Sequence, residues 1–358
     1  FFFPLFELGG VEKNFFTISN YIVGQLKYLD FYLITFEKSN FFKKNLHKDI
    51  KIIFLNSKIS FLSRRIKFIY CMCKLFMKCI ENPKASIFSF QGNFYALIVA
   101  IILKRKIIIR SNISPEGWAN NYFKKKLFRF LLSKSNLIIV NGNEFNKRFK
   151  KFFNLRSVTI HNPIFKEREN NLIKKNFFKK NTINLINIGR LVRQKNQSEI
   201  IEALSNIKKK ERFRLLIVGQ GPEKKNLINL IEKRKLKKLV KISDKQKDKN
   251  YYLKKSDIFV LSSLYEGFPN VLLEAALNKK YIVSSDCPTG PKELIKSYKY
   301  GKLYKKNSIS HLSKILQKIA DNHKILFRNK KKISYKSVIF DYKYNLKKYK
   351  KELLNIIN

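Results

Sequence analysis

The stretch IFVLSSLYEGFPNVLLEAALNKKYIVSS, residues 258–285, indicates the fold more clearly than any other part of the chain. It begins with an apolar run of strand length, Ile258–Leu261, and ends with a second one, Tyr281–Ser285. Between them a Gly-Phe-Pro turn precedes Asn270–Asn278, where the spacing of apolar residues is helical. A strand, a helix and another strand in this order predict a βαβ unit, and such units build parallel sheets covered by helices.

The same alternation continues on both sides of this stretch. In the C-terminal half we predict strands at Ile183–Ile188, Phe213–Val218 and Leu239–Ile242, and helices at Gln197–Lys209, Glu223–Lys233 and Asn250–Lys255. The N-terminal half repeats the rhythm more faintly, with predicted strands at Lys51–Leu55, Ser86–Phe90, Lys106–Arg110, Asn136–Val140 and Val158–Ile160, and helices at 61–80 and 122–132. We therefore predict an α/β protein with two doubly wound, Rossmann-like domains facing a central cleft.

Domain boundaries follow from composition. Residues 166–181 are polar, rich in Lys, Asn and Glu, and lack periodic apolar spacing, so we interpret them as a linker. The predicted N-terminal domain is then 1–165 and the C-terminal domain 182–333. In doubly wound sheets, ligands bind at the carboxyl ends of the strands.

Charge is the extreme feature of the composition. The 358 residues include 76 Lys and Arg against 25 Asp and Glu, a formal net charge of +51. Such an excess attracts polyanions, and an anionic membrane surface is one partner that we expect. A coding bias is the competing explanation, because Lys is spread along the whole chain. No basic segment accompanies a nucleic-acid reading motif, so a specific nucleic-acid partner is not expected.

Cysteine usage and hydropathy indicate a cytoplasmic protein. The cysteines Cys71, Cys73, Cys79 and Cys287 have neither metal-ligand spacing nor the spacing of a disulfide framework. The apolar run Phe94–Leu103 is too short to cross a bilayer. We expect a reducing compartment and no spanning helix.

Polar clusters follow three of the predicted strands. The first runs from Gly189 to Asn196 and contains Arg190 and Lys195, five residues apart in a loop that enters a helix. Two fixed cations there would neutralise a departing diphosphate without a metal ion. The alternative is that both are ordinary surface charges. A third cluster, Asp286–Glu293, is dense in Pro and Gly, which is typical of a shaped loop or a simple turn.

The second cluster, Glu266 to Glu274, is the most informative. A glycine lets the backbone approach a ligand closely, and a proline suits the first turn of a helix, whose amino end attracts phosphate. Glu274, one turn inside, would accept hydrogen bonds from ribose hydroxyls, and Glu266 would lie near a transferred sugar. The predicted donor-binding residues here are Gly267, Phe268, Pro269, Asn270, Val271 and Glu274.

Together these motifs resemble the retaining GT-B glycosyltransferases of glycosyltransferase family 4, also called group 1. The residues that carry the resemblance are Gly189-Arg190 with Lys195, Gly219-x-Gly221-Pro222, Glu266-Gly267-Phe268-Pro269 with Glu274, and the loop Gly290–Glu293. Near the N-terminus, Gly9-Gly10-Val11-Glu12 resembles the family's glycine loop, which faces the donor. The variant Cys287-Pro288-Thr289-Gly290-Pro291 resembles members that add sugars, often N-acetylhexosamines, to lipid-linked glycans or surface polysaccharides.

The resemblance implies a UDP-sugar donor, no metal or other cofactor, and retention of anomeric configuration. Arg190, Lys195 and Glu266 would be the catalytic residues, while Glu274 would hold the ribose. Gly9 and Gly10 would contact the donor from the N-terminal domain. The acceptor would be a lipid-linked glycan or oligosaccharide at the inner face of the plasma membrane. A last helical stretch, in 334–358, would cross back to the N-terminal domain.

The chain departs from the family pattern at two places. Many members carry His in the loop after the fourth strand, where this chain has Arg110-Ser111-Asn112, so Asn112 is the candidate for the donor-sugar contact. The glycine expected after Leu239–Ile242 is replaced by Ser243-Asp244, which bears on base recognition.

Two other functions compete with this interpretation. A polyanion-binding protein would explain the charge but not the pattern from Glu266 to Glu274. A GT-B nucleotide-sugar 2-epimerase would need acid and base residues in the N-terminal domain, where acids are sparse. The sequence has neither a Gly-x-x-x-x-Gly-Lys-Ser/Thr loop nor an Asp-x-Asp motif, so it predicts no ATPase and no metal-dependent transferase.

Overall fold

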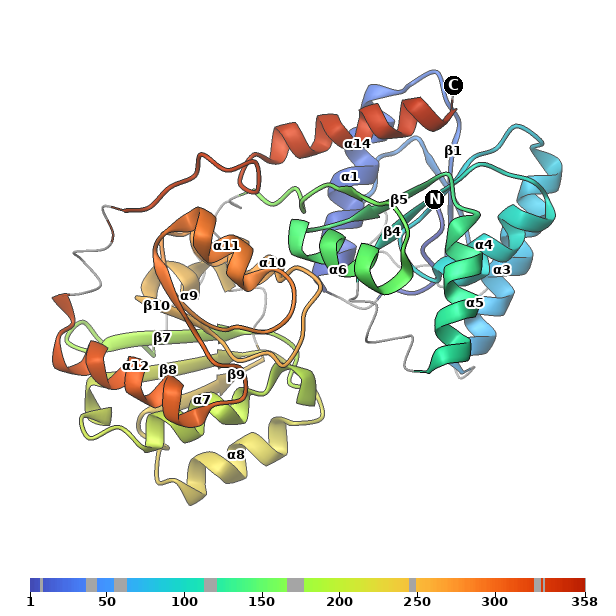
Figure 1. The fold of residues 1–358 in the computed structure, drawn as a ribbon. Helices are drawn as coiled ribbons and strands as arrows, with labels where there is room; N and C mark the ends of the chain where they lie inside the picture. Colours follow the sequence, from blue (N-terminus) through green and yellow to red (C-terminus); the bar gives the residue numbers. More distant parts are fainter. Residues whose placement is uncertain are drawn as a thin grey trace. The chain divides into compact units, whose positions relative to one another are not determined.

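The chain forms two compact units, each built on a parallel sheet (Figure 1). A computed structural model describes residues 1–6, 9–36, 44–54, 63–112, 121–165, 177–244, 249–324, 330 and 332–357. Unit 1 comprises Phe1–Pro163 and Asp341–Asn358, and unit 2 comprises Ile164–Phe340. The last helix of the chain therefore belongs to unit 1. Most of the predicted linker, 166–176, lies outside the described residues.

The strands of unit 1 are all parallel. They are β1 (Phe31–Ile34), β2 (Ile50–Ile53), β3 (Ile87–Ser89), β4 (Ile107–Ser111), β5 (Leu137–Val140) and β6 (Val158–Thr159). They pair in the orders β1-β2 and β3-β4-β5-β6. The N-terminal segment joins the two groups, because Phe2 bridges both Ile34 and Ser89. Strand β1 and this segment were not predicted from the sequence.

Helices cover both faces of the unit 1 sheet. They are α1 (Gly10–Gln25), α3 (Arg64–Glu81), α4 (Asn93–Ile102), α5 (Tyr122–Ser133), α6 (Asn143–Phe153) and α14 (Tyr342–Ile357). Helices α1 and α14 contact each other on one face, while α3, α4 and α6 pack on the other. Strand β4 serves both layers, since Ile107 and Ile109 join one core cluster and Ile108 joins the other.

Unit 2 contains a six-stranded parallel sheet in the order β12-β11-β10-β7-β8-β9. Its strands are β7 (Ile183–Ile188), β8 (Phe213–Val218), β9 (Val240–Ser243), β10 (Ile258–Leu261), β11 (Tyr281–Ser285) and β12 (Gly301–Tyr304). The strand order reverses between β7 and β10. In a doubly wound sheet this reversal is the point where ligands bind, beside the carboxyl ends of the two strands.

The helices of unit 2 connect these strands. They are α7 (Gln197–Ser205), α8 (Lys224–Lys233), α9 (Lys249–Lys255), α10 (Asn270–Leu277), α11 (Pro291–Tyr298) and α12 (Ile309–Asp321), with 3₁₀ turns at Arg193–Lys195 and Lys210–Arg212. The helix predicted to reach Lys209 ends at Ser205, and β12 was not predicted. The α/β class with parallel sheets is confirmed. No helix in the described part of the chain combines the length and hydropathy needed to cross a bilayer.

Candidate functional site

Two loops meet at the point where the strand order of unit 2 reverses. Because β7 and β10 are parallel neighbours, the loops that follow them leave the same edge of the sheet. Three hydrogen bonds join the loops: Ser262 Oγ to the Lys195 carbonyl at 2.8 Å, Leu264 N–H to the Gln194 carbonyl at 2.9 Å, and Gln194 Nε2 to the Tyr265 carbonyl at 2.7 Å. The first and second predicted clusters therefore form one structure.

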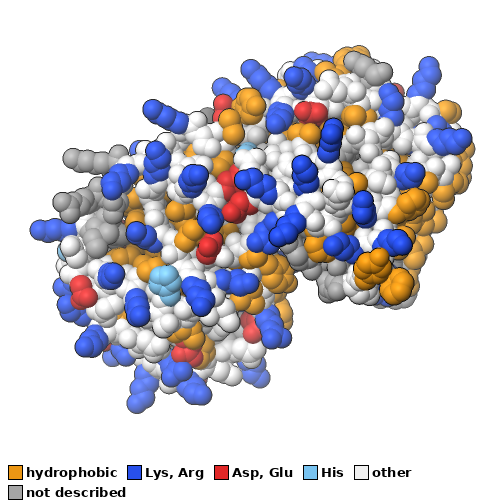
Figure 2. All heavy atoms as spheres, viewed as in Figure 1, with side chains coloured by type: hydrophobic (Ala, Val, Ile, Leu, Met, Phe, Trp, Pro, Cys, Tyr) orange, Lys and Arg blue, Asp and Glu red, His pale blue; other side chains and the backbone are white. Residues whose placement is uncertain are grey.

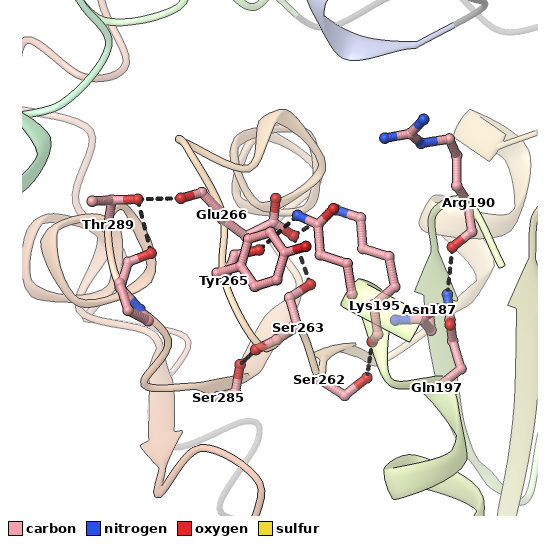
Figure 3. Close-up of polar contacts among 12 residues, drawn as sticks. Asn187, Arg190, Lys195, Gln197, Ser262, Ser263, Tyr265, Glu266, Ser285 and Thr289 are labelled. Atoms are coloured by element: carbon pink, nitrogen blue, oxygen red, sulfur yellow. Dashed lines mark hydrogen bonds and ion pairs between the residues drawn. The ribbon is translucent and has the colours of Figure 1, made fainter. Parts of the chain in front are cut away.

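A nearly buried ion pair lies at the centre of this structure (Figure 3). Lys195 Nζ lies 2.5 Å from Glu266 Oε1, and the two side chains are 16% and 8% exposed. The Ser263 hydroxyl donates to the same carboxylate oxygen at 2.6 Å. A carboxylate removed from water needs such compensation, because an unpaired buried charge is costly. Two of the three predicted catalytic residues, Lys195 and Glu266, are thus brought into direct contact, a pairing that the sequence did not predict.

Arg190 occupies the same loop but is exposed. Its carbonyl accepts a hydrogen bond from Gln197 Nε2 at 3.0 Å, which fixes the backbone where α7 begins. Figure 3 shows the guanidinium extending to the side of the loop on which the Lys195 ammonium meets Glu266. The two predicted anion-binding cations therefore differ in environment: one is held by a carboxylate and one extends from the surface.

The glycine turn after β8 supports this loop. A Cβ atom on Gly219 would lie 1.8 Å from the Gly189 carbonyl oxygen, and one on Gly221 would lie 2.3 Å from the Leu191 carbonyl oxygen. Gly221 also has a φ of 153°, in the region that favours glycine. Leu191 N–H donates to the Gln220 carbonyl at 2.7 Å. Without side chains, Gly219 and Gly221 let the backbone of the turn after β8 contact the backbone of the loop after β7. Their role in the structure is therefore to let this turn pack against the loop that carries Arg190.

Glu274 lies in α10, which begins at Asn270 with Pro269 as its N-cap. The glutamate is 5% exposed, and Lys249 Nζ donates to its Oε1 at 2.8 Å. Lys249 opens α9 and its side chain is 23% exposed. Lys249 was not identified from the sequence. It lies 25 residues before Glu274, and no sequence motif links the two positions.

The third predicted cluster also contacts the Glu266 turn. Thr289 has a φ of 64°, which is rare for a β-branched residue, and its hydroxyl donates to the Glu266 carbonyl. Gly290 has a φ of 98°, and a Cβ there would lie 2.7 Å from Pro269 Cδ. Backbone in these conformations persists only where surrounding contacts enforce it. The loop after β11 is therefore a shaped support for the turn that carries Glu266.

Cys287, in the same loop, is not a reactive thiol. Burial raises the pKa of Cys287 to about 12, and the nearby negative charge of Glu266 acts in the same direction. A thiol with that pKa stays protonated near neutral pH and is a poor nucleophile. In the described residues no group of three or more His, Cys, Asp or Glu side chains could hold a metal ion.

The remaining predicted residues belong to unit 1. Gly9 caps α1, which begins at Gly10, and its φ of −157° is ordinary extended backbone. Asn112 follows β4; its Nδ2 donates to the Phe90 carbonyl at 2.8 Å, and its Oδ1 accepts from Arg110. The side chain that replaces the family's histidine is thus fixed by contacts within unit 1. Its role as a donor contact stays a prediction.

Arg110 is a fully buried cation that sequence reasoning passed over. Its Nε donates to the Tyr349 hydroxyl at 2.9 Å, and its Nη2 donates to Asn162 Oδ1 at 2.6 Å. The bond to Tyr349 ties β4 to the C-terminal helix α14, and the bond to Asn162 ties β4 to the segment after β6. Arg110 therefore fixes the position of Asn112 and anchors α14 to the unit 1 sheet.

Comparison with known proteins gives a family match in the C-terminal half. Residues 168–338 match the family described as glycosyl transferases group 1. An uncharacterized glycosyltransferase of Methanocaldococcus jannaschii is 31% identical over 69% of this chain and 54% of that protein. The chain thus spans about half the length of that relative.

A second relative is matched over more of its length. The N-acetylgalactosamine-N,N'-diacetylbacillosaminyl-diphospho-undecaprenol 4-alpha-N-acetylgalactosaminyltransferase of Campylobacter jejuni is 24% identical over 71% of this chain and 72% of that enzyme.

Among solved structures, Anabaena Alr3699/HepE in complex with UDP-glucose aligns with a TM-score of 0.75 at 18% identity, covering 99% of this chain and 98% of that one. At this identity the likeness concerns the fold, and it confirms the GT-B architecture expected from the sequence.

Proposed function

We propose that this chain, whose residues 168–338 match the group 1 glycosyltransferases, is a metal-independent, retaining enzyme of that family that moves a sugar from a UDP-sugar to a lipid-linked glycan or surface polysaccharide. The observation that carries the proposal is the Lys195–Glu266 pair, which lies where the strand order reverses and beside the amino end of α10. Fixed charge of both signs at this position suits a substrate that contains a diphosphate and a sugar.

The geometry of unit 2 supports a proposal for how the donor binds. The first amides of α10 and the guanidinium of Arg190 would bind the diphosphate, because a helix amino end and a cation both favour an anion. Glu274, one turn into α10, would accept hydrogen bonds from the ribose. Gly267 does not have a positive φ, so its backbone conformation does not require a glycine. We propose instead that a side chain at this position would occupy the space of the ligand. The Anabaena neighbour, whose complexes hold UDP and UDP-glucose, supports this choice of donor.

We derive the roles of the residues in the reaction from the negative charge that develops on the leaving diphosphate. The acceptor oxygen bonds to the anomeric carbon as the bond from that carbon to the diphosphate breaks, and UDP leaves with the electron pair. Lys195 and Arg190 stabilise the negative charge on the leaving diphosphate, as preorganised donors do in other transferases. Glu266 holds the Lys195 ammonium in place and contacts the donor sugar. The acceptor hydroxyl gives its proton to an oxygen of the departing diphosphate as the new bond forms, so the products are the glycosylated acceptor and UDP.

The acceptor is assigned from a relative and from charge. The Campylobacter relative is named for a diphospho-undecaprenol acceptor, and the net charge of +51 suits anionic lipid phosphates. We assign the enzyme to the inner face of the plasma membrane as a peripheral protein. An N-acetylhexosamine is our choice of donor sugar, on the basis of the Cys287–Pro291 variant. The family match disfavours both the polyanion-binding and the 2-epimerase alternatives.

A panel of nucleotide sugars tests the proposal directly. Release of UDP is measured for the wild-type chain and for Glu266→Gln, with and without a polyprenyl-diphosphate-linked sugar acceptor. We expect release from one UDP-sugar to depend on the acceptor and to fall sharply in the variant. Conversion of the nucleotide sugar to its epimer, or no turnover with any donor while polynucleotides bind, would contradict the proposal.

A further inference from the structure

Exposed apolar side chains concentrate on one side of unit 1. Of the nineteen large apolar side chains that are exposed among the described residues, eleven lie on the neighbouring helices α3, α4 and α5. They are Ile66, Ile69, Met77 and Ile80 on α3, Ile98, Ile101 and Ile102 on α4, and Tyr122, Phe123, Leu127 and Phe130 on α5. We call this set the α3–α5 face. Its extent is unusual, since scattered single apolar side chains are the normal pattern on a protein surface.

The apolar residues form stripes along each helix. On α3, the positions 66, 69, 73, 77 and 80 are spaced by three or four residues, so they share one side of the helix. The opposite side of α3, with Phe68, Cys71, Leu75 and Cys79, packs into the core. Helix α5 has the same spacing at 123, 127 and 130, and only Leu132 of that helix is buried. The exposed stripes therefore consist of residues other than those that pack into the core.

Cations surround these stripes, and acids are almost lacking. Helix α3 contains five Lys or Arg and α5 contains four, whereas Glu81 is the single acid in the three helices, all of which are described. Lys78 neutralises Glu81 at 2.8 Å. The exposed basic side chains include Lys124, Lys126 and Arg129 on α5. Figure 2 shows orange side chains gathered over this edge of unit 1 with blue side chains between them.

We propose that the α3–α5 face docks on an anionic lipid bilayer, with its apolar stripes entering the headgroup region and its cations contacting lipid phosphates. Apolar and basic side chains interleaved on one helical surface are typical of interfacial membrane binding. A second copy of this chain is a poorer partner, because two such cationic faces would repel each other. The inference deepens the proposed peripheral location by naming the surface, and it is tested without enzyme turnover.

A native cysteine provides a reporter within the face. Cys73 is exposed and lies in the α3 stripe, whereas Cys71, Cys79 and Cys287 are buried. Burial raises the pKa of Cys71 to about 12 and that of Cys287 to about 12, so a thiol-reactive fluorophore should label Cys73 selectively. The emission of the labelled full chain is followed as vesicles of phosphatidylcholine, with or without phosphatidylglycerol, are added. We expect a blue shift with the anionic vesicles only.

A control label at a second position distinguishes docking through the α3–α5 face from nonspecific attraction by the overall charge. Ile228 on α8 of unit 2 is also an exposed apolar side chain, so Ile228→Cys in a Cys73→Ser chain carries the same fluorophore elsewhere. We expect no blue shift at position 228. Equal shifts at both positions, or none at position 73, would overturn the proposal.

Charge variants make the same comparison for binding strength. The triple variant K124Q/K126Q/R129Q removes three exposed cations from α5, and K225Q/K233Q/K238Q removes three exposed cations from unit 2. Each cation near an anionic bilayer contributes about 1 kcal/mol, so the α5 variant should bind vesicles about 100-fold more weakly. The unit 2 variant should bind nearly as well as the wild type. Equal weakening in both variants would mean that net charge alone attracts the protein.

An apolar variant tests insertion and excludes self-association. Phe123 is 81% exposed, so Phe123→Ser should fold, and it should weaken vesicle binding about tenfold or more by removing an inserted ring. Ile228→Ser is the control and should leave vesicle binding unchanged. If Phe123→Ser instead dissociates an oligomer in sedimentation velocity and leaves vesicle binding unchanged, the face is an interface between copies and the proposal is wrong.

Discussion

Replacing Lys195 with Met removes the ammonium from the Lys195–Glu266 pair and keeps most of the aliphatic stem. The Glu266 side chain is 8% exposed, and among the described residues the Ser263 hydroxyl would remain as the hydrogen-bond donor to its Oε1. Removing one partner of a buried ion pair costs about 3–5 kcal/mol. The Lys195 side chain is 16% exposed, so water reaches part of the pair, and we expect the lower end, about 3 kcal/mol. Urea unfolding followed by circular dichroism measures this loss.

The double variant K195M/E266Q separates stability from catalysis. It leaves no buried charge, so its free energy of unfolding should return to within about 1 kcal/mol of the wild type. UDP release should nevertheless stay about 100-fold or more below the wild-type rate, because both the cation that stabilises the leaving diphosphate and the Glu266 carboxylate are gone. If the double variant has the expected stability, its loss of turnover cannot be attributed to unfolding.

Two outcomes would refute this reasoning. Wild-type turnover of Lys195→Ala or Lys195→Met would show that the ammonium does not act on the diphosphate. Recovery of turnover in the double variant would show that neither the Lys195 ammonium nor the Glu266 carboxylate acts in the reaction and that the two serve only to neutralise each other. Lys209→Met is the matched control, because Lys209 also pairs with an acid, Asp321, but both side chains are about half exposed. That variant should match the wild type in stability and turnover.

Three further predictions concern the ribose contact, metal removal and pH. Glu274→Gln should weaken UDP binding about tenfold in calorimetry, because ribose hydroxyls lose a charged acceptor; unchanged affinity would remove Glu274 from the donor site. Turnover should survive EDTA, and complete loss that Mg²⁺ restores would contradict the proposed mechanism. Burial raises the pKa of Glu199 above 4.5, so the folded state binds this proton more tightly than the unfolded state and loses stability as pH rises. Glu199→Gln should therefore stabilise the fold near pH 7, with no gain at a pH below the unfolded-state pKa of about 4, and a less stable variant at pH 7 would disprove this.

The strands of unit 2 could be predicted from the sequence because both faces of their sheet are covered. Strands buried on both sides appear as continuous apolar runs, and every residue of β7 and β11 is buried. The prediction was weaker in unit 1, where strands such as β2 have only one buried residue. The N-terminal segment was missed because its place between β1 and β3 depends on Phe2 meeting two residues far along the chain.

The site shows the same division. Loop composition alone identified the residues after β7, β10 and β11, since Gly and Pro mark turns whatever the fold. Composition did not indicate that Lys195 pairs with Glu266 across 71 residues, or Lys249 with Glu274 across 25. It also did not indicate that Gly219 is needed for contact with the Gly189 carbonyl.

The sequence by itself determined the elements, the class of fold and the residue types available for chemistry, because apolar periodicity and turn residues act locally. The tertiary structure decided which of those residues touch. Sheet order placed β7 beside β10 and so brought a lysine and a glutamate from separate loops into one buried pair. Helix packing decided which sides of α3, α4 and α5 face the core and which carry apolar side chains into solvent. Both outcomes depend on contacts between distant segments, and local pattern does not encode which distant segments become neighbours.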